Sequence, residues 1–243
     1  MKNIVIAAGY ATRLYPLTEN FPKPLLRVGG STILDRMMAD IDRIPAIDGH
    51  IVVTNHKFAP IFHEWASKTP YSKPISIIDD GTTDNDHRLG AVRDLLLAID
   101  NCGVDDDIMV VAADNILDFS FAGFVDFFHA KGTSVIMRHH EPELRRLQRT
   151  GVIAIDADEK VLEMQEKPER PVSHWAVPPF YIYSRADLPA IRACLDHGCG
   201  TDAPGNLARY MAGVTDLHAW EMPGHRFDIG SMDSYREAQQ IFS

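Results

Sequence analysis

Residues 3–26 read NIVIAAGYATRLYPLTENFPKPLL, and this stretch decides the fold. It opens with a continuous apolar run, residues 3–7, which is typical of a strand buried on both faces of a parallel or mixed sheet. A loop of small residues around Gly9 follows at once, and its backbone N–H groups can approach a phosphate closely. Ligands of open α/β sheets bind outside the carboxyl ends of strands, so we expect this loop to contact a ligand.

The alternation of buried strand and helix continues along the chain. Short apolar runs predict strands, and stretches with apolar residues three or four apart predict helices between them. After about Gly151 the strands follow one another with few helices. We therefore predict an α/β, Rossmann-like fold with a mixed, mostly parallel sheet and helices on both faces. The expected strands are 3–7, 50–53, 75–78, 108–112, 134–137, 151–155, 161–165 and 176–183, and the expected helices are 33–44, 61–68, 89–100, 121–130, 186–196, 206–211 and 234–242.

Composition limits the classes of partner. The chain has 243 residues, 45% of them hydrophobic, and a formal net charge of −10. This charge disfavours binding to nucleic acid or to an anionic membrane, although a local basic pocket can still hold a nucleotide. The three cysteines predict no disulfide framework, and no stretch approaches the roughly 20 apolar residues of a membrane span. We expect a cytoplasmic protein with no nucleic-acid or membrane partner.

Two basic residues stand close to the small-residue loop. Arg13 offers a planar, permanently charged fork for phosphate oxygens. Lys23 lies between Pro22 and Pro24, and we expect it in a stiff, extended segment because prolines discourage helix. Each signal alone is also typical of an ordinary connection or of a solvated surface turn.

Together, the residues from Ala7 to Leu26 resemble the pattern A-A-G-x-G-T-R-L-x-P-L-T-x-x-x-P-K-P-L-L. That pattern is the signature of the sugar-phosphate nucleotidylyltransferases, or nucleotide-diphospho-sugar pyrophosphorylases. The resemblance covers nearly the whole chain and implies the GT-A-like fold of nucleotide-diphospho-sugar transferases in one domain, 1–243. Residues 1–120 would form its nucleotide-binding half and residues 121–243 its acceptor-binding half. The implied reaction transfers a nucleoside monophosphate from NTP to a sugar 1-phosphate or similar acceptor, giving an NDP-sugar and pyrophosphate.

The resemblance also implies roles for the N-terminal loop, which lies over the triphosphate in this family. The motif arginine and lysine hold phosphates there, which makes Arg13 and Lys23 catalytic candidates. Ala11 departs from the family, which usually has glycine, and we expect its φ to be negative because its Cβ would otherwise cause strain. The implied nucleotide-binding residues of the loop are Ala8, Gly9, Ala11, Thr12 and Arg13.

Two further motifs imply a metal site. Residues 110–115, VVAADN, resemble the end of a family strand with a G-D-N motif, and residues 225–231, HRFDIGS, are similar to W-x-D-I-G-T. The aspartates of these motifs bind Mg²⁺ in the family, which assigns Asp114 and Asp228 as metal ligands and catalytic residues. Two carboxylates suit this hard cation. From the residues alone, a turn at Asp114 and a helix cap at Asp228 are the alternatives.

The acceptor side rests on residues 165–168, QEKP, which resemble an E-K-P motif, and on Gly151, which resembles the glycine of a Y-G-V turn. The resemblance implies that Lys167 binds the acceptor phosphate, Glu166 a sugar hydroxyl and the Gly151 backbone another. Without it, a solvated strand end is the usual interpretation.

Two segments stay less defined. Arg88 and Gly90 fall in the family's base- and ribose-recognition region, although a capped helix start explains them equally well. Residues 202–206 either border the acceptor pocket or form a turn. Pro178 and Pro179 replace a small residue that faces the sugar in many members, so the acceptor stays open.

Two other functions compete with the sugar-phosphate reaction. A cytidylyltransferase for phosphocholine could hold a quaternary ammonium in a box of aromatic side chains, although alternating core residues of a strand are favoured for them. A catalytically silent, nucleotide-binding regulatory subunit is the alternative from another class. The sequence leaves open the nucleobase, the acceptor and whether the chain forms a homo-oligomer. The aromatic residues are Trp175, Phe180, Tyr181 and Tyr183.

Overall fold

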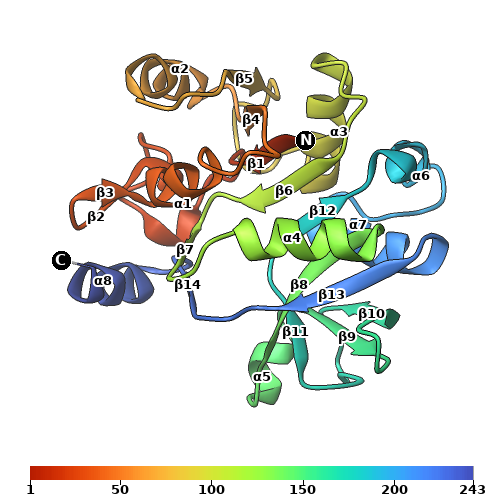
Figure 1. Cartoon of the computed structure of the whole chain (residues 1–243). Coiled ribbons are helices and arrows are strands. Elements are labelled where there is room, and N and C mark those ends of the chain that lie inside the picture. The colour runs from red at the N-terminus through yellow and green to blue at the C-terminus, as the bar shows by residue number, and fades with distance from the viewer. Residues whose placement is uncertain (243) are drawn as a thin grey trace.

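One long mixed sheet runs through the molecule in a computed structural model that describes residues 1–242 (Figure 1). Its strands are β1 (Lys2–Ile6), β4 (Gly49–Thr54), β5 (Ile75–Asp79), β6 (Ile108–Ala112), β8 (Ser134–His140), β9 (Gly151–Ile155), β10 (Val161–Glu166), β11 (Trp175–Val177), β12 (Phe180–Tyr183) and β13 (Leu217–Glu221). Their order is β10-β9-β11-β8-β12-β6-β1-β4-β5, and β13 pairs with β8.

Strand direction changes along this sheet. The N-terminal strands β6, β1, β4 and β5 are parallel neighbours. Strand β12 is antiparallel to both β6 and β8, while β13 is parallel to β8. Strands β9, β10 and β11 pair antiparallel. The predicted α/β fold with a mixed sheet is confirmed, and its C-terminal half is the more antiparallel one.

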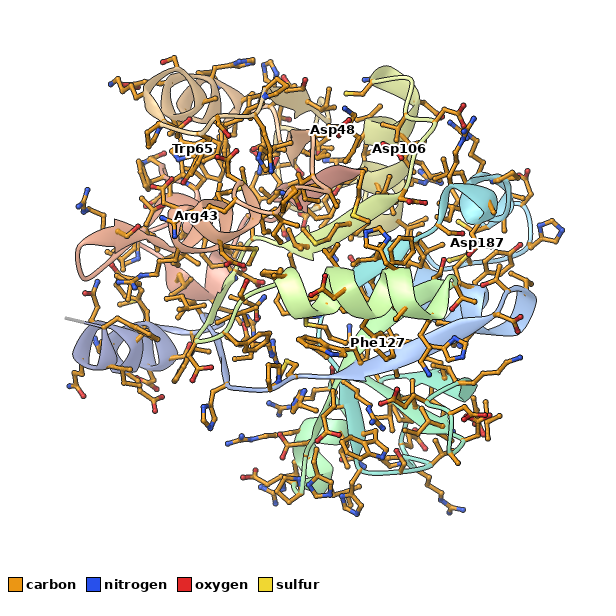
Figure 2. All side chains as sticks on the ribbon, viewed as in Figure 1. Arg43, Asp48, Trp65, Asp106, Phe127 and Asp187 are labelled. Atoms are coloured by element: carbon orange, nitrogen blue, oxygen red, sulfur yellow. The ribbon has the colours of Figure 1, made fainter. Side chains whose placement is uncertain are left out.

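Helices cover both faces of the sheet. Neighbouring residues of a buried strand point to opposite faces, so each central strand contributes side chains to both cores. Ile4 joins the core beneath α3 (Ala91–Asn101), α6 (Leu188–Ala193) and α7 (Pro204–Val214). Val5 joins the core beneath α1 (Ile33–Ile41), α2 (Ala59–Lys68) and α4 (Ala122–Lys131). Trp65 projects from α2 toward α1, where its indole Nε1 donates a hydrogen bond of 2.9 Å to Asp35 Oδ1 (Figure 2).

Several smaller elements complete the chain. The short helix α5 (Leu144–Leu147) follows β8, and α8 (Met232–Ile241) closes the fold. Two small sheets pair β2 (Arg27–Val28) with β3 (Ser31–Thr32) and β7 (Asn115–Leu117) with β14 (Arg226–Asp228). Single 3₁₀ turns are η1 (Thr12–Leu14), η2 (Lys23–Leu25) and η3 (Arg185–Asp187).

The predicted elements differ from the observed ones where local pattern is weak. The expected strand 176–183 is two strands, β11 and β12, because Pro178 and Pro179 have no N–H to donate to a ladder. The expected helix 186–196 is η3 followed by the shorter α6. Strand β13 and the pair β7 and β14 escape sequence reasoning because they are short or bear few apolar residues. Among the described residues, no helix has the length and apolar character needed to cross a membrane.

Candidate active site

Asp114 and Asp228 come together at the end of the central strands. Asp114 directly precedes β7, and Asp228 ends β14, where it lies opposite Asn115 in the antiparallel register. The Ile229 backbone N–H donates a hydrogen bond of 3.0 Å to the Asp114 carbonyl. Lys23 Nζ donates to Asp114 Oδ2 at 2.7 Å and to the Ile229 carbonyl at 3.1 Å. The predicted convergence of two distant acidic residues beside a lysine is therefore present.

The two carboxylates have unequal electrostatic surroundings. Burial opposes ionisation of Asp114, but the charge and hydrogen bond of Lys23 outweigh it, and the pKa of Asp114 lies below its usual value. Asp228 has the opposite balance. Loss of hydration next to the surrounding protein, and then the charge of Asp114, raise its pKa. A Cβ added at Gly230 would lie 3.5 Å from both Asp228 carboxylate oxygens and 3.7 Å from Arg13 Nη2, so Arg13 also borders this pair.

This carboxylate pair fits a divalent cation. Within residues 1–242 the Asp228 carboxylate accepts no hydrogen bond, and the repulsion between two adjacent carboxylates falls when a cation binds both. In the same range no group of three or more His, Cys, Asp or Glu side chains forms a closed metal site. Two carboxylates leave positions for phosphate oxygens and waters, which Mg²⁺ retains in its shell.

A cavity of about 520 Å³ opens on one side of Asp114. Every predicted nucleotide-binding residue lines it: Ala8, Gly9, Ala11, Thr12, Arg13, Arg88 and Gly90. Lys23 lines it as well. The structure thus gathers this predicted set in one place, while its role in binding stays a prediction.

Two expectations about the loop backbone are wrong. Ala11 has φ +48° and ψ +42°, in the left-handed region, where we expected a negative φ. Its carbonyl is fixed by the Thr18 hydroxyl at 2.8 Å and by the Leu14 N–H at 2.9 Å, which hold the residue there despite its Cβ. Lys23 is not in an extended segment but starts the 3₁₀ turn η2, closed by the Leu26 N–H on its carbonyl at 3.0 Å.

A buried asparagine that sequence reasoning missed supports the loop. Asn55, which follows β4, donates from Nδ2 to the Ala8 carbonyl at 3.0 Å and accepts at Oδ1 from the Phe58 N–H at 3.1 Å. Its only signal in the sequence is a polar residue directly after an apolar strand. The small residues after β1 are therefore held from the neighbouring strand.

Gly90 and Arg88 are tied to the segment between α6 and α7. Gly90 has φ +91°, and an added Cβ would lie 2.5 Å from the Thr201 carbonyl oxygen, so only glycine fits. Arg88 Nε donates to Asp202 Oδ1 at 3.0 Å. Asp202 lines the nucleotide-side cavity, whereas Gly205 lines the acceptor-side cavity described next. Residues 202–205 thus border both.

A larger cavity, of about 1070 Å³, opens on the other side of Asp114 and includes Asp228. All three predicted acceptor-binding residues line it: Gly151, Glu166 and Lys167. Burial raises the pKa of Glu166. Its carboxylate lies against the first turn of α7, where a Cβ added to Gly205 would be 2.0 Å from Glu166 Oε2. Lys167 is exposed and has φ +49°. Pro179 and Asp114 line both cavities, which therefore meet at the carboxylate pair.

Arg226 is a second residue of this site that sequence reasoning missed. Its Nη1 donates to Asn115 Oδ1 at 2.7 Å, across the β7 and β14 pair. Its charge lowers the pKa values of Asp114 and Asp228. It stands two residues before Asp228, at a position similar to the tryptophan of W-x-D-I-G-T, and this departure is the signal that could have found it.

The aromatic residues around β12 belong to the core. Phe180 joins the core on the α4 side, while Tyr181 and Tyr183 join the core on the α7 side. The face of Trp175 is covered by the Arg138 guanidinium, whose carbon lies 4.3 Å from the ring centroid. A box for a quaternary ammonium is not assembled from these four residues.

Comparison with known proteins gives the family. The model of the nucleotidyl transferase family matches residues 2–242. The chain belongs to this family. It is 26% identical to the glucose-1-phosphate adenylyltransferase of Fervidobacterium nodosum over 98% of this chain and 60% of that protein. It is 27% identical to the UTP--glucose-1-phosphate uridylyltransferase AglF of Haloferax volcanii over 99% of this chain and 96% of that protein.

A solved structure supports the fold. The crystal structure of UDP-glucose pyrophosphorylase complexed with UDP-glucose matches with a TM-score of 0.85 at 19% identity, covering 99% of this chain and 97% of that one. The predicted family and its fold are confirmed. The chain spans 60% of the length of the first relative and 96% of the second.

Proposed function

We propose that the chain is a Mg²⁺-dependent nucleotidyltransferase that transfers a nucleoside monophosphate from a triphosphate to a sugar 1-phosphate, releasing pyrophosphate. One observation carries this proposal: two cavities meet at Asp114, one lined by Arg13 and Lys23, the other by Lys167 and Glu166. The first suits a triphosphate and the second a phosphorylated acceptor with hydroxyl groups. The relatives named for glucose 1-phosphate support a sugar acceptor.

The reaction needs no general base. A phosphate oxygen of the acceptor, already anionic at neutral pH, forms a bond to the α-phosphorus of the triphosphate. The bond from that phosphorus to the bridging oxygen of the β-phosphate breaks, and pyrophosphate leaves with the electron pair. Repulsion between the two polyanions is the main barrier, and positioning together with fixed charge lowers it.

The residues divide this work between the two cavities. Arg13 and Lys23 neutralise the triphosphate, and Lys167 holds the acceptor phosphate. The Glu166 carboxylate accepts from a sugar hydroxyl. The Asp114 and Asp228 carboxylates would hold Mg²⁺, which supplies charge neutralisation at the α-phosphate and the leaving group when bound.

A pyrophosphate-release assay tests the proposal. The full chain is incubated with Mg²⁺, each of ATP, CTP, GTP, UTP and dTTP, and a panel of sugar 1-phosphates with phosphocholine. We expect release with at least one triphosphate and sugar 1-phosphate pair and none after removal of Mg²⁺ with EDTA. If pyrophosphate is released with phosphocholine and with no sugar 1-phosphate, the acceptor in the proposal is an alcohol phosphate and not a sugar 1-phosphate. Nucleotide binding without release from any pair would instead favour a silent subunit.

A further inference from the structure

A buried carboxylate lies in the wall of the nucleotide-side cavity and has no task in the reaction above. Asp94, in the first turn of α3, lines this cavity and is only 3% exposed. Within residues 1–242 its Oδ1 is buried and has no hydrogen-bond partner. Buried polar atoms are nearly always paired, and an unpaired carboxylate is costly. Such a group points to a ligand that supplies the missing donor.

No group among residues 1–242 donates a hydrogen bond to this oxygen. Burial, and then the charge of the nearby carboxylate Asp80, raise the pKa of Asp94 to about 7. The Asp80 Oδ2 is itself buried without a partner, while its Oδ1 accepts from the Thr82 hydroxyl at 2.7 Å. Tyr10 donates its hydroxyl proton to the Thr82 carbonyl at 2.9 Å and is thereby occupied. Asp80 does not itself line the cavity, but its charge acts on Asp94 and makes this end of the cavity wall acidic.

The acidic part lies away from the cationic part. Lys23 pairs with Asp114, which follows β6, whereas Asp80 follows β5. Because the strand order is β6-β1-β4-β5, these two strand ends are three strand spacings apart, about 14 Å. A triphosphate is attracted to the cationic end and repelled from the acidic end. With the phosphates placed at Arg13 and Lys23, the nucleobase reaches toward Asp94.

The chemistry of the nucleobases then separates them. A hydrogen bond donated by the bound base favours the ionised form of Asp94, and an ionised carboxylate accepts hydrogen bonds and cannot donate them. Adenine, cytosine and guanine carry an exocyclic amino group, which is a donor. Uracil and thymine instead place a single N3–H between two carbonyl oxygens, and those oxygens repel a carboxylate. Because these oxygens flank the N3–H donor on both sides, uracil and thymine pair less well with a buried carboxylate than a base that presents an amino group, and a buried polar group left poorly paired is a strong basis for discrimination.

We infer that Asp94 is a specificity-determining residue that selects triphosphates with an amino-bearing nucleobase over UTP and dTTP. The inference rests on the proposed function, which places a nucleoside triphosphate in this cavity. Asp80 supports Asp94 by keeping this end acidic, and the amino group of the bound base supplies the hydrogen bond that the protein lacks.

The test measures the equilibrium binding of ATP, CTP, GTP, UTP and dTTP to the full chain with Mg²⁺ by titration calorimetry at pH 8, above the pKa of Asp94. We expect the tightest ligand to be ATP, CTP or GTP, and UTP and dTTP to bind at least about 10-fold more weakly. Asp94→Asn places both a donor and an acceptor at the same point. It should shift the affinity ratio toward UTP and dTTP by roughly 10- to 100-fold.

Two controls separate base reading from other effects. Asp100→Asn lies on the exposed side of the same helix and should leave every ratio unchanged. Arg13→Ala should weaken all five triphosphates by a similar factor, because the proposed function places this arginine at the phosphates, which all five share. The ranking for the unchanged protein is informative even if Asp94→Asn does not fold.

The inference is overturned if UTP or dTTP binds the unchanged protein most tightly, or if folded Asp94→Asn keeps the original ranking. If the predicted ranking appears but no sugar 1-phosphate yields pyrophosphate, the proposed function fails and the assignment of Asp94 stands. If none of the five triphosphates binds, both fail.

Discussion

Lys23 Nζ lies 2.7 Å from Asp114 Oδ2, although the two residues are 91 positions apart in the sequence. This ion pair gives the carboxylate pair its asymmetry, because Lys23 offsets the charge of Asp114 while the protein and Asp114 together raise the pKa of Asp228. Asp228 is therefore the carboxylate that gains most from a cation.

Replacing Asp228 with Asn should reduce turnover by about 10²- to 10³-fold or more, because one of the two proposed metal ligands and its charge are lost. The free energy of unfolding should stay the same or rise slightly, since Asn removes the repulsion between this position and Asp114. Pyrophosphate release and urea denaturation measure the two effects. Asp233→Asn on α8 is the matched control, with a side chain that is 94% exposed. Near-normal turnover of Asp228→Asn contradicts the metal assignment.

Arg226→Met should move the acid limb of the pH profile of kcat/KM to higher pH. Arg226 lowers the pKa values of Asp114 and Asp228, so without it both carboxylates keep their protons to higher pH. Ionised carboxylates are needed to hold a cation, and activity at low pH falls accordingly. Arg236→Met, on the exposed face of α8, should leave the profile in place. An unshifted limb in Arg226→Met argues that the arginine serves only the Asn115 contact.

Gly205→Ala should raise the KM for the acceptor by about 10-fold and leave the KM for the triphosphate nearly unchanged. The added Cβ would lie 2.0 Å from Glu166 Oε2, which forces that carboxylate out of its position in the acceptor cavity. Gly213→Ala, in the same helix, meets nothing within 4 Å and controls for the change in helix propensity. Steady-state kinetics with both substrates decides, and an effect confined to the triphosphate counts against the role of Glu166.

Asp94 should make the ligand-free protein less stable as pH rises. Its pKa is about 7 in the folded chain and 3.8 as the ordinary value, so the folded state binds the extra proton between these two values. The free energy of unfolding therefore falls through that window, by a few kcal/mol. Urea denaturation at pH 5 and pH 8 should show this fall reduced in Asp94→Asn and retained in Asp100→Asn. If the free energy of unfolding falls equally with pH in all three proteins, Asp94 is not the group responsible.

Ala11→Gly should stabilise the protein by about 0.5–1 kcal/mol, because relief of the left-handed strain outweighs the entropy that glycine adds to the unfolded chain. For a chain of this size that corresponds to about 1–4 °C in Tm. Ala212→Gly, inside α7, should instead lose about 1 kcal/mol. Calorimetry compares the two variants, and destabilisation by Ala11→Gly shows that the methyl group makes a packing contribution.

Much of the fold could be predicted because its signals are local. A run such as Ile108–Ala112 is apolar throughout and rich in β-branched residues, which is typical of a strand in a sheet covered on both faces. The backbone conformation of the loops could not be predicted, because Thr18 holds Ala11 at positive φ and Asp114 positions Lys23. These contacts come from residues that local pattern does not connect.

The sequence by itself determined the alternation of the main strands and helices, the family, and the residue types available to the site. Tertiary structure alone decided that the two cavities share Asp114, that Arg226 stands beside the carboxylate pair, and that Asp94 is buried without a partner. The physical reason is that burial and pairing depend on what the rest of the chain brings to a side chain. Periodicity in the sequence records only which face of its own element a residue occupies.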